Sequence, residues 1–311
     1  MKNCIWRAAF VCAATLLFVL SLSAQTVRTD NNGRDLKPTG KGWGELDTRP
    51  ELNGSQNGAA GLARARTNGI SYHGGPVMTT TKNVYLIWYG TWSSTAQSII
   101  SNYPQTVGGS SYFNINTTYH NGSNTPVSNS VALKGTTTDN YSLGKSLSDS
   151  SIQTIVTNAI SSGRLPKDTG GVYFVMTASD VNETSGFCTQ YCGWHTRGTI
   201  LGSDIKFAFV GNPARCLSSC AAQSTSPNGD AGADGAVSIV AHELEEAATD
   251  PDLNAWYDSR GEENADKCAW TFGTTHTASN GSQYNITLGS RQYLIQRNWV
   301  NASGGFCSMT F

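Results

Sequence analysis

The sequence predicts an α+β fold in which helices pack on a mixed β-sheet. Several short runs of apolar, β-branched and aromatic residues have the composition of buried strands. Other stretches place apolar residues three and four positions apart, as the buried face of a helix requires. These predicted strands and helices do not alternate strictly along the chain, which favours α+β over a regular α/β arrangement.

The N-terminal end, residues 1–24, has the pattern of a secretory signal peptide. Lys2 and Arg7 supply positive charge, residues 8–22 are apolar, and small residues follow. The apolar stretch is short for a transmembrane anchor, and no later segment is apolar enough to span a bilayer. We therefore expect a secreted protein, located in a cell wall or periplasm, with no membrane span after signal cleavage.

Two further parts follow the signal. Residues 25–70 are rich in Asn, Gly, Arg and Thr and lack apolar periodicity, which predicts a flexible N-terminal segment or propeptide. Residues 71–311 carry all the strand and helix patterns, and we expect them to form one domain.

The first half of this domain opens with a strand at residues 84–89, where every residue is apolar or aromatic. A helix is expected at 93–103, with Ser93 or Ser94 as its N-cap. The next segment is rich in small polar residues and holds a short strand at 130–133.

A second helix is expected at residues 148–162, capped by Ser148 or Asp149, because isoleucine and valine recur there at helical spacing. Strands follow at 171–177 and 205–210.

The last helix is expected at about residues 236–249, where Pro251 ends it because proline cannot continue a helix. In the tail, residues 282–287 and 291–296 have the pattern of a pair of antiparallel strands. A sheet with a backing helix and a later helix bearing His-Glu is also the layout of the zincin metallopeptidases, an analogy of layout only.

The formal net charge is −1 and only 14% of the residues are charged, so no basic surface for nucleic acid is expected. The chain has no G-x-S-x-G, Walker or dinucleotide-binding motif, which disfavours a serine hydrolase, an NTPase and a Rossmann enzyme.

Cysteines concentrate after residue 187, so the C-terminal half is expected to be stapled by disulfides. Residues 180–200 are expected to form a loop around the first cysteine pair. Local proximity, with the remaining two joined, predicts the pairs Cys188–Cys192, Cys216–Cys220 and Cys268–Cys307. The rival interpretation is a four-cysteine zinc site built from the two C-x-x-x-C pairs, which an oxidising compartment disfavours.

The candidate chemistry lies in the last helix, in an H-E-x-x-E sequence. Residues four apart share a helix face, so His242 and Glu246 can converge on one Zn²⁺ ion. Glu243 points elsewhere, as the general base does in the H-E-x-x-H metalloprotease helix. The alternative without a metal is a histidine paired with a carboxylate, with Glu245 and Glu246 on a solvated helix face.

A zincin-type site needs a third protein ligand. We favour Asp266, because a disulfide at Cys268 would hold its backbone. Glu263 is the first alternative, and His195, just after a cysteine, is a second. His73 beside two glycines is a further candidate, because glycine allows close backbone approach.

Residues 228–235 alternate oxygen-bearing side chains with glycine, a pattern that Ca²⁺ could use, although the full EF-hand motif is missing. The alternative is a turn that caps the following helix.

Several separated blocks resemble the plant phosphate-induced-protein (Exordium) family in order. The resemblance runs from about residue 70 to the C-terminus, and its blocks include residues 72–76, 84–90, 186–188, 226–230, 241–244 and 254–257. It implies a secreted protein, in plants of the cell wall, linked to growth and cell expansion, and it implies no particular reaction. Glu245 departs from the alanine expected there. The signal and compact loops suit a bacterial member.

Two hypotheses follow. The first is a secreted zinc-dependent hydrolase acting on extracellular peptides, with His242, Glu246 and Asp266 holding the metal and Glu243 as base; a carboxylate in place of the second histidine should weaken the Lewis acid. The second is a non-catalytic protein that acts on or with a cell-wall component, in which the motif is structural or degenerate.

Overall fold

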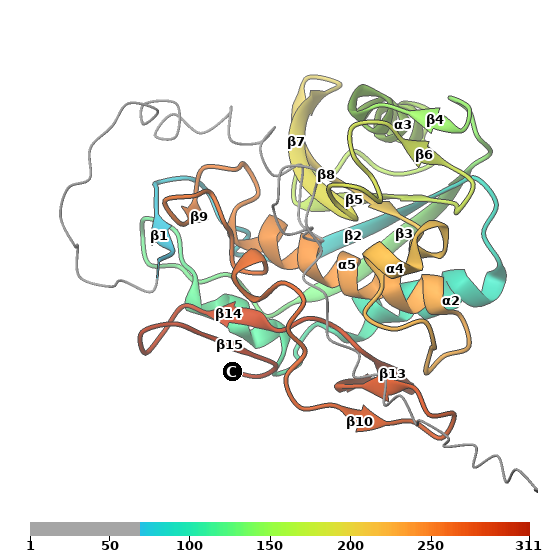
Figure 1. Cartoon of the computed structure of the whole chain (residues 1–311). Coiled ribbons are helices and arrows are strands. Elements are labelled where there is room, and N and C mark those ends of the chain that lie inside the picture. Colours follow the sequence, from blue (N-terminus) through green and yellow to red (C-terminus); the bar gives the residue numbers. More distant parts are fainter. Residues whose placement is uncertain (1–68) are drawn as a thin grey trace, which may run out of the picture.

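The computed structural model describes residues 69–311 (Figure 1). The predicted signal peptide and nearly all of the predicted N-terminal segment lie outside these residues, and both stay predictions. Within the described part, no helix combines the length and apolarity needed to cross a membrane.

A five-stranded mixed sheet forms the centre of the fold, and its strand order is β3-β2-β5-β8-β7. The first four strands are parallel to one another, whereas β7 pairs with β8 in the antiparallel direction and forms one edge. In that order, the strands are Val131–Asp139, Lys82–Tyr89, Gly171–Thr177, Ser203–Gly211 and Gly193–Ile200. The predicted mixed sheet is thus confirmed.

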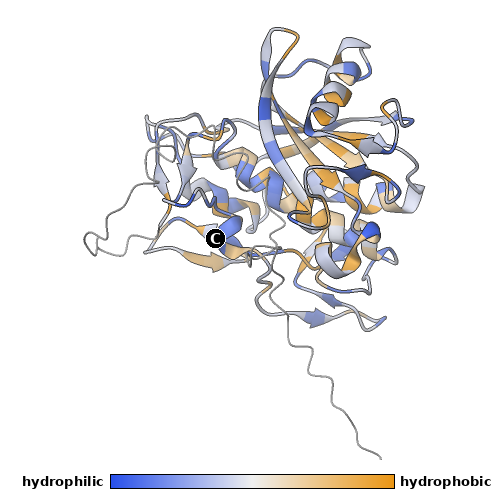
Figure 2. Ribbon diagram, turned by 45° about the horizontal axis from the view of Figure 1, so that its top comes forward, coloured by the Kyte–Doolittle hydropathy of each residue, from blue (hydrophilic) through white to orange (hydrophobic). Residues whose placement is uncertain are grey.

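Helices cover both faces of this sheet. In Figure 1, α2 (Ser94–Thr106) and α5 (Ala231–Thr249) lie on one face, and α3 (Asp149–Ser161) lies on the other. Every residue of β5 is buried as a result, as expected for a parallel strand with both faces covered. Figure 2 shows that hydrophobic residues concentrate in the central strands and in the helix faces turned toward them.

The first two predicted helices form where expected because their N-terminal N–H groups find side-chain acceptors. Ser93 caps α2, accepting a hydrogen bond from a backbone N–H of the first turn. Ser148 caps α3 in a reciprocal capping box with Ser151.

Helix α5 begins at Ala231, about five residues earlier than predicted. Asp230 caps it by accepting a hydrogen bond from the Ala233 backbone N–H (2.9 Å), which starts the helix before the apolar run. It ends at Thr249, two residues before Pro251, as predicted.

The loop predicted for residues 180–200 is wrong for two segments of that range. That region contains the short strand β6 (Asn182–Glu183) and the edge strand β7. Glycine at both 193 and 198 and the charged Arg197 give β7 a weak strand signal, and its hydrogen bonds to β8 override that signal.

The remaining strands form small two-stranded sheets, all antiparallel except β4–β6. They pair β1 (Ser71–Tyr72) with β9 (Trp256–Tyr257), β4 (Ser146–Leu147) with β6, β10 (His276–Thr277) with β11 (Gln283–Tyr284), β12 (Ile286–Leu288) with β13 (Arg291–Tyr293), and β14 (Asn298–Val300) with β15 (Phe306–Ser308). The predicted tail pair is therefore right only for the residues next to its turn, because Gln283–Tyr284 pairs with β10 instead.

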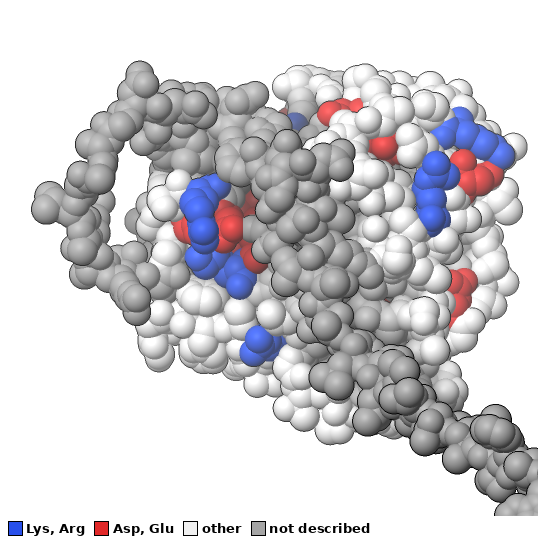
Figure 3. All heavy atoms as spheres, viewed as in Figure 1, with Lys and Arg blue, Asp and Glu red and all other residues white. Residues whose placement is uncertain are grey.

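Short helical turns complete the fold. They are η1 (Phe113–Thr118), η2 (Pro213–Arg215), α4 (Leu217–Cys220) and η3 (Asp266–Cys268). Charged groups are sparse on the face in Figure 3, where basic and acidic side chains lie beside one another.

Three disulfides form, but two of the predicted pairs are wrong. Cysteines of the two C-x-x-x-C segments join across rather than within their segments, as Cys188–Cys216 and Cys192–Cys220. The two segments lie side by side, so each cysteine faces a partner 28 residues away, with Cα atoms 5.8 and 5.5 Å apart. The third predicted pair, Cys268–Cys307, is confirmed. Because all four cysteines of the two segments are oxidised, they cannot form the rival zinc site.

Candidate functional site

Helix α5 carries the candidate site at a depth unusual for charged residues. His242, Glu243, Glu245 and Glu246 are each no more than 1% exposed. Charged side chains are rarely this buried unless they are paired or bind a metal. The alternative that Glu245 and Glu246 form a solvated helix face is therefore wrong.

Three of the predicted ligands lie together, and we call them the η3 set: His242, Glu246 and Asp266. His242 Nε2 lies 2.9 Å from Glu246 Oε1 and 3.7 Å from Asp266 Oδ1. The η3 turn brings Asp266 to the helix, where its backbone N–H donates to Glu246 Oε1 (3.2 Å). The i,i+4 spacing and the downstream residue thus converge as the sequence predicted.

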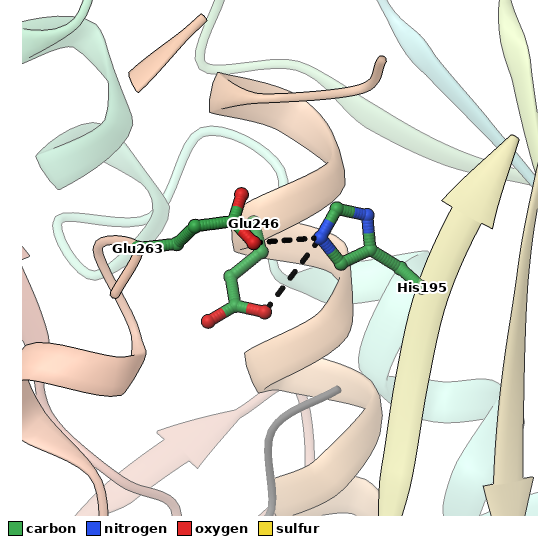
Figure 4. Close-up of side chains that lie close together, drawn as sticks. All are labelled: His195, Glu246 and Glu263. Carbon is green, nitrogen blue, oxygen red and sulfur yellow. Dashed lines mark hydrogen bonds and ion pairs between the residues drawn. The ribbon is translucent and has the colours of Figure 1, made fainter. Parts of the chain in front are cut away.

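Both alternative ligands also lie here, in a second group that we call the β7 set: His195, Glu246 and Glu263 (Figure 4). His195 Nε2 lies 3.2 Å from Glu263 Oε2 and 3.7 Å from Glu246 Oε2. Strand β7 supplies the histidine, so the missed strand decided the position of this residue. All three side chains are buried.

These distances suit metal ligation. Two donors on one tetrahedral zinc ion, with bonds of roughly 2.1 Å, lie about 3.4 Å apart. In each set the donor atoms are within 4.8 Å of one another. His242 Nε2 is close to Glu246, yet no hydrogen bond of acceptable geometry reaches this nitrogen from the described residues. Imidazole and carboxylate are zinc donors, so the η3 set fits such an ion.

Gln296 holds the other side of the His242 ring and was missed by sequence reasoning. Its amide nitrogen lies 2.9 Å from His242 Nδ1, and its amide oxygen accepts the Trp270 backbone N–H (2.7 Å). In this orientation Nδ1 accepts, and the proton of a neutral ring stays on Nε2. An ion at Nε2 requires the opposite tautomer, with Nδ1–H donating to Gln296. Ion binding and rotation of this amide are therefore linked.

Glu243 faces a different neighbour from His242. A Cβ placed on Gly193 of β7 would lie 3.1 Å from Glu243 Oε1 and 2.5 Å from Ile239 Cγ2. The glutamate thus lies between α5 and the edge strand, and the missing side chain at Gly193 leaves it room.

The side chain of Glu245 contacts Tyr112 and not the residues around Glu243. The hydroxyl of Tyr112 donates to its Oε2 (3.3 Å), and burial raises the pKa of the carboxyl well above its usual range. It belongs to neither set.

His73 lies outside both sets. Its ring stacks on Tyr257, with centroids 3.8 Å apart, and its Nε2 is 3.1 Å from the Tyr257 carbonyl oxygen.

In the loop before α5, Asp234 accepts hydrogen bonds from Ser226 and Asn228, and Asp230 caps the helix. This is the capping turn that the sequence offered as the alternative to a calcium loop, and Ca²⁺ binding stays an untested prediction.

Fold and site together define a class: a disulfide-bonded α+β protein with a buried histidine–carboxylate cluster between a helix and the edge strand of a mixed sheet. Residues 70–309 match the family described as the phosphate-induced protein 1 conserved region. The chain belongs to this family, as the resemblance predicted.

Named relatives come from plants. Protein EXORDIUM-like 3 of Arabidopsis thaliana is 33% identical over 299 residues, which cover 80% of this chain and 87% of the relative. Protein PHOSPHATE-INDUCED 1 of Nicotiana tabacum is 31% identical, covering 63% of this chain and 69% of the relative. They give no support to the prediction of a bacterial member. No solved structure matches the chain.

Proposed function

We propose that the chain is an extracellular, growth-related protein of the Exordium type, without catalytic activity, whose domain is stabilised by a buried divalent ion. Its family membership supports the growth-related role, and three disulfides support an oxidising, extracellular location. A cell-wall component is the partner that this role requires.

One observation carries the metal part of the proposal: His242 Nε2 lies 2.9 Å from Glu246 Oε1, next to Asp266. His242 and Glu246 are each 1% exposed, so a substrate has little access to an ion at this position, which favours a structural role for the ion. An ion here would tie α5 to η3, two elements that are adjacent only in the folded chain. We propose zinc, because the donors combine imidazole with carboxylates.

Metal analysis of the purified full chain tests this function. Zinc should co-purify, and His242→Ala should remove zinc bound by the η3 set. A chelator should lower the melting temperature, because an ion at 100 times its dissociation constant adds about 2.7 kcal/mol of stability. Metal-free protein whose melting temperature is insensitive to both chelator and zinc would contradict the metal centre.

A zinc-dependent hydrolase is the second candidate, and the position of Glu243 favours it. This buried carboxylate belongs to α5, the helix that also carries the proposed ligands His242 and Glu246, and it lies against edge strand β7, where a general base would face an extended peptide. The antiparallel edge strand beside the His-Glu helix also supports a zincin-like layout.

Peptide hydrolysis by the zinc-loaded chain distinguishes the two candidates. Activity that Glu243→Gln lowers by roughly 100-fold or more, with the zinc content unchanged, would establish the hydrolase. If wild type and Glu243→Gln show the same background over a peptide library, the non-catalytic function stands.

A further inference from the structure

Glu246 directs its two carboxylate oxygens to different histidines. Oε1 lies 2.9 Å from His242 Nε2, and Oε2 lies 3.7 Å from His195 Nε2. Each histidine has its own second carboxylate: Asp266 for His242 and Glu263 for His195. The two sets therefore share one residue but no donor atom.

We propose that the cluster holds two divalent ions bridged by the Glu246 carboxylate. This inference rests on the proposed metal centre at the η3 set and adds a second ion at the β7 set. Each ion would receive one imidazole nitrogen, one oxygen of Glu246 and one oxygen of another carboxylate.

The two histidines belong to separate groups of convergent donors among the described residues, which argues against one ion serving all five side chains. Ions joined by bridging ligands in proteins lie about 3.5–4 Å apart, which the span of one carboxylate permits. An oxygen-rich donor set with one imidazole per ion suits Zn²⁺, Mn²⁺ or Fe²⁺.

With a second ion, edge strand β7 would supply one ligand of the metal centre. His195 comes from β7, Glu246 from α5, and Glu263 from the segment just before η3, as Figure 4 shows. All three are at most 2% exposed. An ion bound by them would join β7 to the disulfide-bonded C-terminal segment, in addition to the helix contact that the first ion makes.

Zinc stoichiometry tests the proposal. The full chain is stripped with chelator, reloaded with excess Zn²⁺, desalted and measured by mass spectrometry. We expect about two zinc ions per chain in the wild type and about one in either His195→Ala or His242→Ala. Glu246→Gln should lower the occupancy of both positions. His276→Ala, which removes an exposed histidine on β10, should retain both ions.

The outcomes separate the two proposals. About one zinc in the wild type, unchanged by His195→Ala, would overturn the second ion and leave the first. No zinc in the wild type would overturn the metal centre itself. If His195→Ala fails to fold by circular dichroism, Glu263→Gln removes a donor of the same ion with less loss of volume, and retention of two ions in that variant would overturn the proposal.

Manganese gives an independent readout. Wild type loaded with Mn²⁺ should show the electron paramagnetic resonance of two spin-coupled ions, and Glu263→Gln should show that of an isolated ion. An isolated-ion spectrum in fully loaded wild type would contradict a carboxylate bridge.

Discussion

Gly193 on β7 lies against Glu243 on α5, and a Cβ at this glycine would approach the glutamate Oε1 to 3.1 Å. The same Cβ would come within 2.5 Å of Ile239 and 2.8 Å of the Phe209 carbonyl oxygen. Real Cβ atoms do not tolerate such contacts, so the spacing between the edge strand and the helix depends on this glycine.

Gly193→Ala should therefore destabilise the protein by about 1–3 kcal/mol through overpacking. Chemical denaturation monitored by tryptophan fluorescence measures this loss. Gly198→Ala is the matched control on the same strand, because its added Cβ meets only the movable end of Gln153. Equal stability of the two variants would show that the strand–helix spacing adapts freely.

Gln296→Glu should raise zinc affinity by about 10-fold or more, the usual scale for partners that orient a ligating histidine. A carboxylate can accept both His242 Nδ1–H and the Trp270 backbone N–H, whereas the amide can accept with only one of its two ends. Competition with a fluorescent zinc chelator measures the affinity. Gln190→Glu, at an exposed site, controls for the change of net charge, and equal affinities in the two variants would contradict this role of Gln296.

Lys82 gives the fold a defined pH dependence. Burial lowers the pKa of its ammonium group to about 7. Below pH 7 the Lys82 side chain is protonated in both the folded and the unfolded chain, so the folded state bears the full free-energy cost of burying the charged ammonium group. Between pH 7 and about 10.5 only the unfolded chain holds the proton, so this contribution to stability rises with pH.

The effect of Lys82→Met on stability should accordingly be most favourable at neutral pH and progressively less favourable toward pH 10, whereas the loss of the Nζ hydrogen bonds to Ser128 acts at every pH. The difference in unfolding free energy should shrink by up to about 1.4 kcal/mol per pH unit. Urea titrations at a series of pH values measure it. A difference that does not vary with pH would show that Lys82 keeps its ordinary pKa in the fold.

The two crossed disulfides should each contribute about 3–4 kcal/mol, since each closes a loop of 28 residues in the unfolded chain. Replacing either pair by alanines should lower the denaturation midpoint accordingly. A non-reducing digest with mass spectrometry checks the connectivity directly. Peptides joining Cys188 to Cys192 would contradict the crossed arrangement.

Sequence periodicity was sufficient to predict the strands and helices whose own residues carry a clear apolar pattern. Residues 84–89 and 172–176, the greater part of strands β2 and β5, are apolar or aromatic throughout. Helices α2 and α3 carry serine caps and apolar faces, so local pattern and final structure agree. The i,i+4 spacing likewise placed His242 and Glu246 together without tertiary information.

Tertiary structure alone decided the rest. Strand β7 has little strand signal, and pairing with β8 both forms it and brings His195 to Glu246. The cysteine pairs cross because two loops lie side by side, which no spacing within one loop reveals. The physical reason is common to all these features: local sequence determines backbone preference and side-chain periodicity, whereas contacts between distant segments depend on how the whole core packs.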